Sequence, residues 1–293
     1  MTRVALAFDK IREDTVGIYF ERACQTLGIH FDHFWTRNAS AIPLGYDLYL
    51  RIDHGDYQDD LPTHLHPKVF YATDTHLPKS WRRIRRVANR YDLMCCAHRP
   101  AAGLLPNGAW VPVACDPDLH SSAPADEKRW DVAFVGTEGG VPRKFYLQAL
   151  RERYPQSLIG HAAHTELGAI YSRAKMGFNY SIRDDINMRM FEIWCAGTLL
   201  VTNQLPHDDL ARLGFFERTH YVAYRNPKEL FEMIDYYLRH ESEREAIAMQ
   251  GHRHALRAHT YAHRLRQILA LTSQRTSGAI SMPRMEGVAC ASS

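Results

Sequence analysis

Two charged residues, Arg189 and Glu192, stand in a largely apolar segment of the sequence. Residues 187–203 (NMRMFEIWCAGTLLVTN) predict a helix, a left-handed residue at Gly197 and a buried strand at 198–202. Side chains three positions apart share one face of a helix, and a charge on a buried helix needs a partner. Either Arg189 and Glu192 pair with each other, or they face a phosphorylated ligand together with the helix N-terminus, whose free N–H groups attract anions.

Two further features of the sequence lie close to this helix or could bind an anion. A carboxylate at Asp184 or Asp185 would accept hydrogen bonds from the first turn of this helix, so we expect one of them to cap it. The glycine-rich loop 136–140 (GTEGG) follows a predicted strand at 130–135 and precedes Arg143, so its backbone N–H groups could also approach an anion. Its spacing matches neither GxGxxG nor a P-loop, and a flexible turn with solvated basic residues is the simpler alternative.

Polar side chains follow the predicted strands of the first half of the chain. These strands lie at 4–8, 46–52, 69–72, 93–96 and 110–113, and they alternate with predicted helices. Such alternation favours a parallel sheet with helices on both faces, whose ligands lie at the carboxyl ends of the strands. Those ends carry Asp9, Lys10, Asp53, His54, Asp74, His76 and His98. We expect these residues to line one site together, although any one of them also suits an ordinary loop.

The composition narrows the class of protein. The chain has 293 residues, 45% of them hydrophobic and 24% charged, with a net charge of +3. These values are typical of a globular protein and give no case for nucleic acid as a partner. No apolar run approaches the roughly 20 residues of a membrane helix, and no signal peptide is recognised. The six cysteines include no CxxC pair and the 17 histidines no HExxH spacing. We therefore expect a cytoplasmic protein with reduced cysteines and no metal site.

The alternation of strand and helix is interrupted once. Residues 115–129 are polar and rich in Pro, Ser and charge, as in a linker between domains. A second series of strands and helices starts at 130, and long helical segments follow from 227 with a break near 259–261. From about 273 the composition turns to Ser, Gly and Ala, which predicts a surface tail. The chain is long enough for two α/β domains, and this organisation predicts them.

An ordered set of motifs in the C-terminal half resembles the CgeB-type (spore-maturation-like) glycosyltransferases. These are FVG at 134–136 with Arg143 after it, YSRAKMGFN at 171–179, INMRMFEIWCAG at 186–197, LLVTN at 199–203, YRNPKEL at 224–230 and AHTYAHR at 258–264. The N-terminal half matches more loosely, through YDLYLRID, YATDTH, YDLMCCAH and WVPVACDPDLH. The number and order of the C-terminal motifs make the resemblance specific.

This resemblance implies the GT-B architecture, an α/β fold in which two Rossmann-like domains with parallel sheets face each other across a cleft. An acceptor-side domain would span 1–120, and a nucleotide-sugar-binding domain 130–260. A C-terminal helix at about 261–272 would cross back to the first domain, with 273–293 as the tail. The activity implied is transfer of a sugar from a nucleoside-diphosphate sugar, UDP-sugar being the first candidate, without a cofactor. The acceptor would be a glycan, a protein or a small molecule.

The resemblance also implies roles for residues of the C-terminal half. Glu192 matches the acidic residue that binds the ribose hydroxyls in related retaining enzymes. Eight positions before it those relatives carry Glu, whereas this chain has Asp184, which leaves the role of that position open. The remaining donor contacts implied are Gly136, Arg143, Asn187 and Arg189.

The departing nucleoside diphosphate develops charge that either a metal or arginines and a helix N-terminus must stabilise. The sequence Asp116-Pro117-Asp118 has the letters of a DxD metal motif but stands in the predicted linker, so we predict metal-independent transfer. A general base would come from the N-terminal strand ends, with Asp74 and His76 as candidates. A retaining enzyme would need no such base, and His76 would then only orient the sugar. A sugar-nucleotide epimerase of the same fold and a non-catalytic nucleotide-sugar-binding module remain as alternatives.

Overall fold

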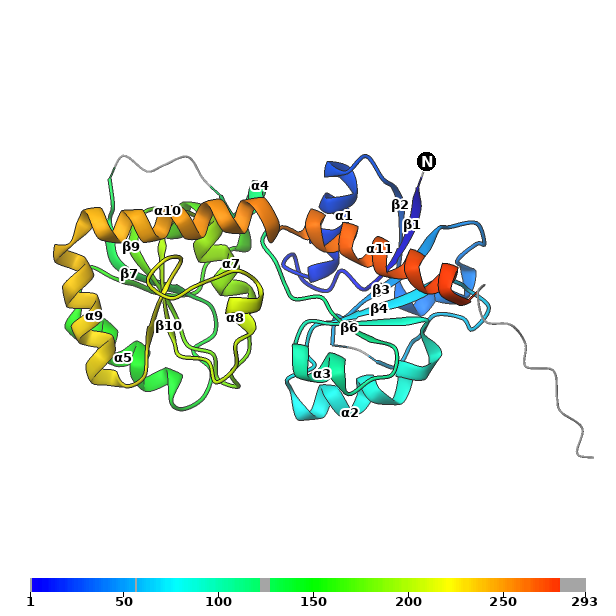
Figure 1. The fold of residues 1–293 in the computed structure, drawn as a ribbon, viewed down its shortest axis with the longest axis horizontal. Helices are drawn as coiled ribbons and strands as arrows, with labels where there is room; N and C mark the ends of the chain where they lie inside the picture. Colours follow the sequence, from blue (N-terminus) through cyan, green and yellow to red (C-terminus); the bar gives the residue numbers. More distant parts are fainter. Residues whose placement is uncertain (1, 56, 122–126, 280–293) are drawn as a thin grey trace, which may run out of the picture.

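Two parallel β-sheets form the framework of the protein (Figure 1). The structure is a computed structural model that describes residues 2–55, 57–121 and 127–279. The six-stranded sheet contains, in spatial order, β2 (His30–Phe34), β1 (Arg3–Ala7), β3 (Leu48–Ile52), β4 (Lys68–Ala72), β5 (Leu93–Cys96) and β6 (Gly108–Trp110). The five-stranded sheet contains β11 (Val222–Tyr224), β10 (Leu199–Asn203), β9 (Ala174–Asn179), β7 (Trp130–Val135) and β8 (Leu158–Gly160). The two sheets confirm the predicted pair of Rossmann-like α/β domains.

Helices connect the strands and cover the sheets. The α-helices are α1 (Val16–Thr26), α2 (Pro78–Val87), α3 (Arg99–Gly103), α4 (Pro117–His120), α5 (Arg143–Arg153), α6 (Leu167–Ser172), α7 (Met188–Cys195), α8 (Asp209–Arg212), α9 (Pro227–Arg239), α10 (Glu241–Ala258) and α11 (Tyr261–Ala279). Short 3-10 helices are η1 (Thr36–Ala41), η2 (Ala88–Arg90) and η3 (His164–Glu166). Across the described parts of the chain, none of the helices has the length and apolar character of a membrane span.

Each sheet is buried on both faces because its apolar side chains alternate between two cores. In β1, Val4 and Leu6 pack with α1 and α11, whereas Ala5 and Ala7 pack on the opposite face with Ile84 of α2. The second sheet repeats this arrangement with α6 and α7 on one face and α5 and α9 on the other. Successive side chains of a strand point to opposite faces, so a strand covered on both sides must be apolar throughout.

The strand order reverses once in each sheet, between β1 and β3 in the first and between β7 and β9 in the second. At such a reversal the loops leaving the two neighbouring strands diverge to opposite faces and leave a crevice at their carboxyl ends. The loops concerned here follow β1, β3, β7 and β9. They therefore hold the side chains that a ligand between the domains would meet.

Two segments cross between the domains, and their backbones are hydrogen-bonded to each other. The Cys115 N–H donates to the His259 carbonyl at 3.1 Å, and the Tyr261 N–H donates to the Cys115 carbonyl at 3.0 Å. Beyond this point α11 continues from α10 onto the first domain, where Tyr261 and Leu265 join the core against α1 (Figure 1). The buried Arg264 donates to the Pro112 carbonyl at 2.7 Å, which ties α11 to the segment that follows β6.

Three segments differ from the sequence-based expectation. Strand β2, with the sequence HFDHF, lies at the edge of its sheet, and its half-polar pattern gave no strand signal. The strand expected at 110–113 ends at Trp110. The carbonyls of Pro112 and Val113 accept hydrogen bonds from Arg264 instead of from a neighbouring strand. Helix α11 runs to Ala279, past the expected start of the tail, and residues 280–293 lie outside those described.

Candidate active site

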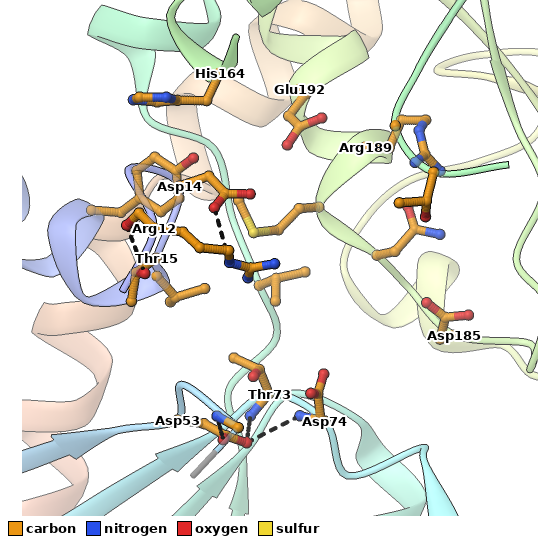
Figure 2. Close-up of a pocket in the computed structure, with 18 of the residues that line it drawn as sticks. Arg12, Asp14, Thr15, Asp53, Thr73, Asp74, His164, Asp185, Arg189 and Glu192 are labelled. Carbon is orange, nitrogen blue, oxygen red and sulfur yellow. Dashed lines mark hydrogen bonds and ion pairs between the residues drawn. The ribbon is translucent and has the colours of Figure 1, made fainter. Parts of the chain in front are cut away.

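A cleft of about 1130 Å³ lies between the carboxyl ends of the two sheets. Its walls come from the first turns of α7 and from the loops after β1, β3, β7 and β9, at the two strand-order reversals, and after the neighbouring strands β4 and β5. Of the residues singled out from the sequence, the cleft is lined by Asp53, His54, Asp74, His76, His98, Gly136, Arg143, Asp185, Asn187, Arg189 and Glu192. Figure 2 shows part of this lining, with Asp53 and Asp74 facing Arg189 and Glu192 from opposite walls.

Arg189 is anchored by uncharged oxygen atoms. Its Nε donates to the Val135 carbonyl at 3.0 Å and its Nη1 to the Asn179 side-chain oxygen at 3.2 Å. The guanidinium also lies 4.2 Å from the centre of the Phe134 ring, a favourable cation–π contact. Gly136 has a φ of +138°, and a Cβ there would meet the Arg189 guanidinium at 2.5 Å. Glycine at this position therefore makes room for the arginine.

Arg143 is anchored in the same manner, at the start of α5. Its Nε donates to the Glu138 carbonyl at 2.9 Å and its Nη2 to the Thr137 carbonyl at 3.0 Å. Burial, and then the nearby charge of Arg189, lower the pKa of Arg143. Among the residues that the structure describes, neither arginine forms an ion pair with a carboxylate. The cleft wall thus holds two positive charges that an anionic ligand would neutralise.

The N-terminus of α7 adds to this positive wall. The helix starts at Met188 with Asn187 as its N-cap, and the Asn187 side chain makes no capping hydrogen bond. The expectation that Asp184 or Asp185 caps the helix is therefore wrong. The Asn187 Nδ2 donates instead to the Ser181 hydroxyl at 3.2 Å, while its buried Oδ1 has no hydrogen-bond partner among the described residues. The first N–H groups of α7 stay available for a ligand.

Glu192 is buried in the cleft wall one turn further along α7. Within the described part of the chain its carboxylate accepts no hydrogen bond and forms no ion pair, and the Arg189 guanidinium donates elsewhere, so the pairing with Arg189 is not formed. Figure 2 shows the two side chains leaving α7 in different directions. Burial is the main cause that raises the pKa of Glu192 to about 7, and Arg189 opposes this shift only in part. A carboxylate without a partner in a cleft is suited to accept hydrogen bonds from ligand hydroxyls.

The opposite wall is organised by Asp53, at the carboxyl end of β3. Its carboxylate accepts hydrogen bonds from the backbone N–H groups of Thr73 at 3.1 Å and Asp74 at 3.3 Å, and from the Tyr57 hydroxyl at 3.1 Å (Figure 2). The two bonds to the Thr73 and Asp74 N–H groups, drawn in Figure 2, fix the loop after β4, which presents Asp74 to the cleft; Tyr57 lies outside that view. Burial, and then the Asp53 charge, raise the pKa of Asp74 above its usual range. A carboxyl with a raised pKa is a stronger base than an exposed one.

A family model described as glycosyl transferase-like matches residues 118–270, slightly more than half of the chain. The chain belongs to the glycosyl transferase-like family. A search of curated proteins gave no match. The matched segment contains α7, both anchored arginines and Glu192, so the family assignment covers this wall of the cleft.

Solved structures of glycosyltransferases resemble the whole chain. An α-glucosyltransferase in complex with UDP and a 13-mer DNA containing an HMU base superposes with a TM-score of 0.69 at 8% identity, over 92% of this chain and 99% of that one. Anabaena Alr3699/HepE in complex with UDP and glucose gives 0.60 at 11% identity, over 96% and 100%. The α,α-trehalose 6-phosphate synthase of Burkholderia multivorans gives 0.61 at 12% identity, over 95% and 99%. These likenesses confirm the GT-B fold predicted from the sequence.

Two acidic segments of this glycosyltransferase lie apart from the wall that carries Arg143, Arg189 and Glu192. Asp184 is exposed, has a φ of +56°, and lines a smaller adjoining cavity of about 220 Å³. The neighbouring Asp185 lines both this cavity and the main cleft. Asp116 and Asp118 both bind Arg22 of α1, and Asp116 also caps α4. The DxD letters of the linker therefore have a structural role.

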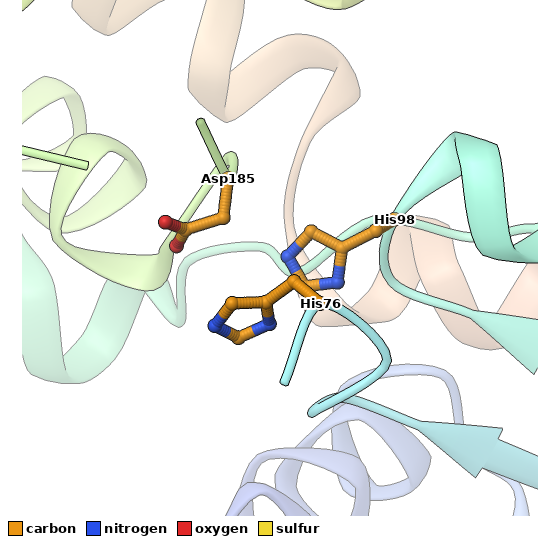
Figure 3. Close-up of side chains that lie close together, drawn as sticks. All are labelled: His76, His98 and Asp185. Carbon is orange, nitrogen blue, oxygen red and sulfur yellow. The ribbon is translucent and has the colours of Figure 1, made fainter. Parts of the chain in front are cut away.

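A cluster that the sequence predicted only in part lies where the two walls of the cleft meet. His76, His98 and Asp185 each place a ligand atom within 4.8 Å of the others (Figure 3). The two histidines follow the adjacent strands β4 and β5, and both are among the strand-end residues that the sequence predicts to line one site. Asp185 follows β9 in the other domain, and only the packing of the two domains brings it here. Burial, and then His76, lower the pKa of His98 to about 4, so its imidazole is neutral near pH 7.

Proposed function

We propose that this protein transfers a sugar from a nucleoside-diphosphate sugar, with a UDP-sugar as the first candidate donor. The observation that carries the proposal is the pair Arg143 and Arg189, two anchored positive charges with no carboxylate partner in the described residues, beside the uncapped N-terminus of α7. A diphosphate is the anion that this arrangement suits best. The solved complexes of the α-glucosyltransferase and of HepE with UDP support the same choice of ligand.

Different donor-side residues would bind different parts of the ligand. The two arginines and the first N–H groups of α7 would hold the diphosphate, with Gly136 allowing its close approach. Glu192 would accept hydrogen bonds from the two ribose hydroxyls through its two carboxylate oxygens. When the bond between the anomeric carbon and the diphosphate oxygen breaks, negative charge grows on the diphosphate. The fixed positive groups stabilise that charge and so lower the barrier.

The acceptor would enter from the wall that carries Asp74 and His76. Its hydroxyl oxygen forms the new bond to the anomeric carbon, and its proton must go to a base. Asp74 is the better candidate for that base because Asp53 fixes its loop, and because burial, and then the Asp53 charge, raise its pKa. In a retaining reaction the departing diphosphate would take the proton instead, and His76 would orient the sugar. Asp184 would lie beside the sugar rather than on the diphosphate.

The narrower assignments are part of the same proposal. We propose that the protein belongs with the CgeB-type glycosyltransferases, a choice supported by the motifs of its C-terminal half, and that it acts in the cytoplasm. The acceptor is a glycan, a protein or a small molecule. Because the α-glucosyltransferase neighbour was solved with DNA, a nucleic-acid acceptor belongs in the screen although the net charge is only +3.

A two-stage experiment tests this function. Thermal shift with UDP, GDP, dTDP and CDP should show one nucleotide that raises the melting temperature, because it binds only the folded state. Arg189→Met should abolish that shift, whereas Lys144→Met, an exposed cation beside Arg143, should keep it. Donor sugars of the preferred nucleotide are then incubated with acceptors and the products are analysed.

Each outcome of the second stage has a distinct meaning. Acceptor-dependent release of nucleoside diphosphate with transfer of the sugar supports the proposal. Conversion of the free nucleotide sugar without any acceptor would identify an epimerase instead. Binding without hydrolysis or transfer would leave a nucleotide-sugar-binding module. No binding of any of the four nucleotides would overturn the donor site itself.

A further inference from the structure

We propose that His76, His98 and Asp185 form a site for a divalent cation of the zinc class, which joins the two domains across the cleft. The three side chains come from three loops, after β4, β5 and β9, and converge at the boundary of the main cleft and its smaller neighbour. Each offers one ligand atom, and these atoms lie within 4.8 Å of one another (Figure 3). Two imidazoles and one carboxylate are a common three-ligand set for zinc, which leaves further positions open to solvent or substrate.

One ring nitrogen of His98 has a hydrogen-bond partner, and the other has none among the described residues. Its Nδ1 lies 2.9 Å from the Thr75 hydroxyl, while its Nε2 is buried and, within the described residues, has no hydrogen-bond partner. The His76 Nδ1 is likewise buried without a partner. A buried polar atom without a partner costs free energy, so two such atoms beside one carboxylate indicate a missing ligand. The Thr75 contact resembles the outer hydrogen bonds that fix metal-binding histidines.

The ligand atoms and their spacing select the class of cation. Magnesium and calcium prefer oxygen ligands, whereas imidazole nitrogen suits zinc, cobalt and nickel. Bonds of about 2.1 Å in a tetrahedral site place neighbouring ligand atoms about 3.4 Å apart. The cluster is therefore slightly open, and small side-chain rotations or a slight closure of the cleft would bring it to that spacing.

A bound ion would tie the two domains to each other, because Asp185 belongs to one domain and both histidines belong to the other. It would hold the cleft closed and occupy His76, a candidate acceptor-side residue. A GT-B cleft must open to exchange its substrates, so we expect the ion to slow turnover. This last consequence rests on the proposed function, whereas binding of the ion does not.

Binding is tested by calorimetry with Zn²⁺ and by the visible absorption spectrum with Co²⁺, on untagged full-length chain. All proteins carry Cys290→Ser, so that this thiol contributes no ligand. One ion per chain is expected. His98→Ala and Asp185→Asn should each weaken binding more than about 100-fold, and Thr75→Val, which removes only the outer hydrogen bond, about 10- to 100-fold.

The matched control is His66→Ala. His66 and Asp92 form an exposed histidine–carboxylate pair at 2.9 Å, which offers one ligand fewer. This variant should bind Zn²⁺ like the parent. Circular dichroism and melting temperature establish that every variant is folded, and Thr75→Val and Asp185→Asn keep the shapes of their side chains.

Absence of a bound ion in the parent, or unchanged affinity in His98→Ala and Asp185→Asn, overturns the proposal. Equal loss in His66→Ala would do so as well, because the binding would then be nonspecific. If transfer activity is found, added Zn²⁺ should inhibit the parent and inhibit Asp185→Asn much less. Failure of the transfer assay alone would count against the proposed function and leave the binding result intact.

Discussion

Arg189 and Glu192 lie three residues apart on α7, yet they do not form an ion pair. The guanidinium donates to the Val135 carbonyl at 3.0 Å and to the Asn179 side chain at 3.2 Å, so its hydrogen bonds are directed away from the carboxylate. Glu192 remains buried, and no residue in the described part of the chain binds its carboxylate oxygens, which a ligand could therefore engage. The sequence left open whether the two residues pair with each other or face a ligand. Because the ion pair is not formed, each side chain can have its own role, and each role can be measured separately.

Glu192→Gln is expected to weaken binding of the cognate nucleoside diphosphate roughly 10- to 100-fold. The reason is the loss of hydrogen bonds to a charged acceptor, worth about 1.5–3 kcal/mol. Titration calorimetry measures it, with Glu152→Gln, an exposed carboxylate on α5, as the matched control. Wild-type affinity together with a large fall in melting temperature would give Glu192 a structural role instead.

The stability of the protein should depend on pH through Glu192. Its pKa is about 7 in the folded protein against an ordinary value of 4.5, so between these values the unfolded chain binds fewer protons than the folded one. The free energy of unfolding should therefore fall as pH rises from 4.5 through 7, by at most about 3 kcal/mol. Denaturant unfolding of the parent and of Glu192→Gln at pH 5 and pH 8 measures the difference. A parallel pH dependence in both proteins would contradict this origin.

Arg143→Met and Arg189→Met should each lower the affinity for the nucleoside diphosphate by about 10- to 100-fold, for the charge-assisted hydrogen bonds lost. Affinity for the nucleoside without phosphates should change much less. The ratio of the two affinities, measured by calorimetry, isolates the contact with the diphosphate. Lys144→Met should leave that ratio unchanged, and an equal fall for both ligands would indicate that the substitution distorts the pocket.

Transfer should not require a divalent metal, because Arg143, Arg189 and the N-terminus of α7 supply the positive charge for the leaving group. Activity with excess chelator should equal or exceed the untreated rate. The assay compares initial rates with and without chelator, followed by addition of Mg²⁺ or Mn²⁺. Activity lost on chelation and restored by either ion would show that the arginines do not suffice.

Asp74→Asn should lower kcat about 100- to 10,000-fold, the usual contribution of a positioned general base, while donor affinity stays near that of the parent. Single-turnover kinetics together with nucleotide calorimetry separate these two quantities. An unchanged kcat would instead favour a retaining reaction in which the leaving diphosphate accepts the proton.

The sequence by itself determined the class of fold and the local structure of the segment 187–203, which forms part of the cleft wall. Alternating apolar runs predicted both parallel sheets, and the segment 187–203 gave α7, the left-handed Gly197 with φ +71°, and β10, all confirmed. These features depend on residues near one another in the chain, whose spacing sets periodicity and turn geometry. The C-terminal motifs that resemble the CgeB-type glycosyltransferases predicted the GT-B fold, because they span most of one domain.

Only the tertiary structure decided which side chains meet. The free carboxylate of Glu192, its pKa of about 7 and the uncapped start of α7 depend on burial and on hydrogen bonds to distant segments. His76 and Asp185 are 109 positions apart in the sequence, and they adjoin because two separately folded sheets pack with their carboxyl ends together. The spacing of residues along a chain carries no information on that packing, since it arises from contacts between whole domains.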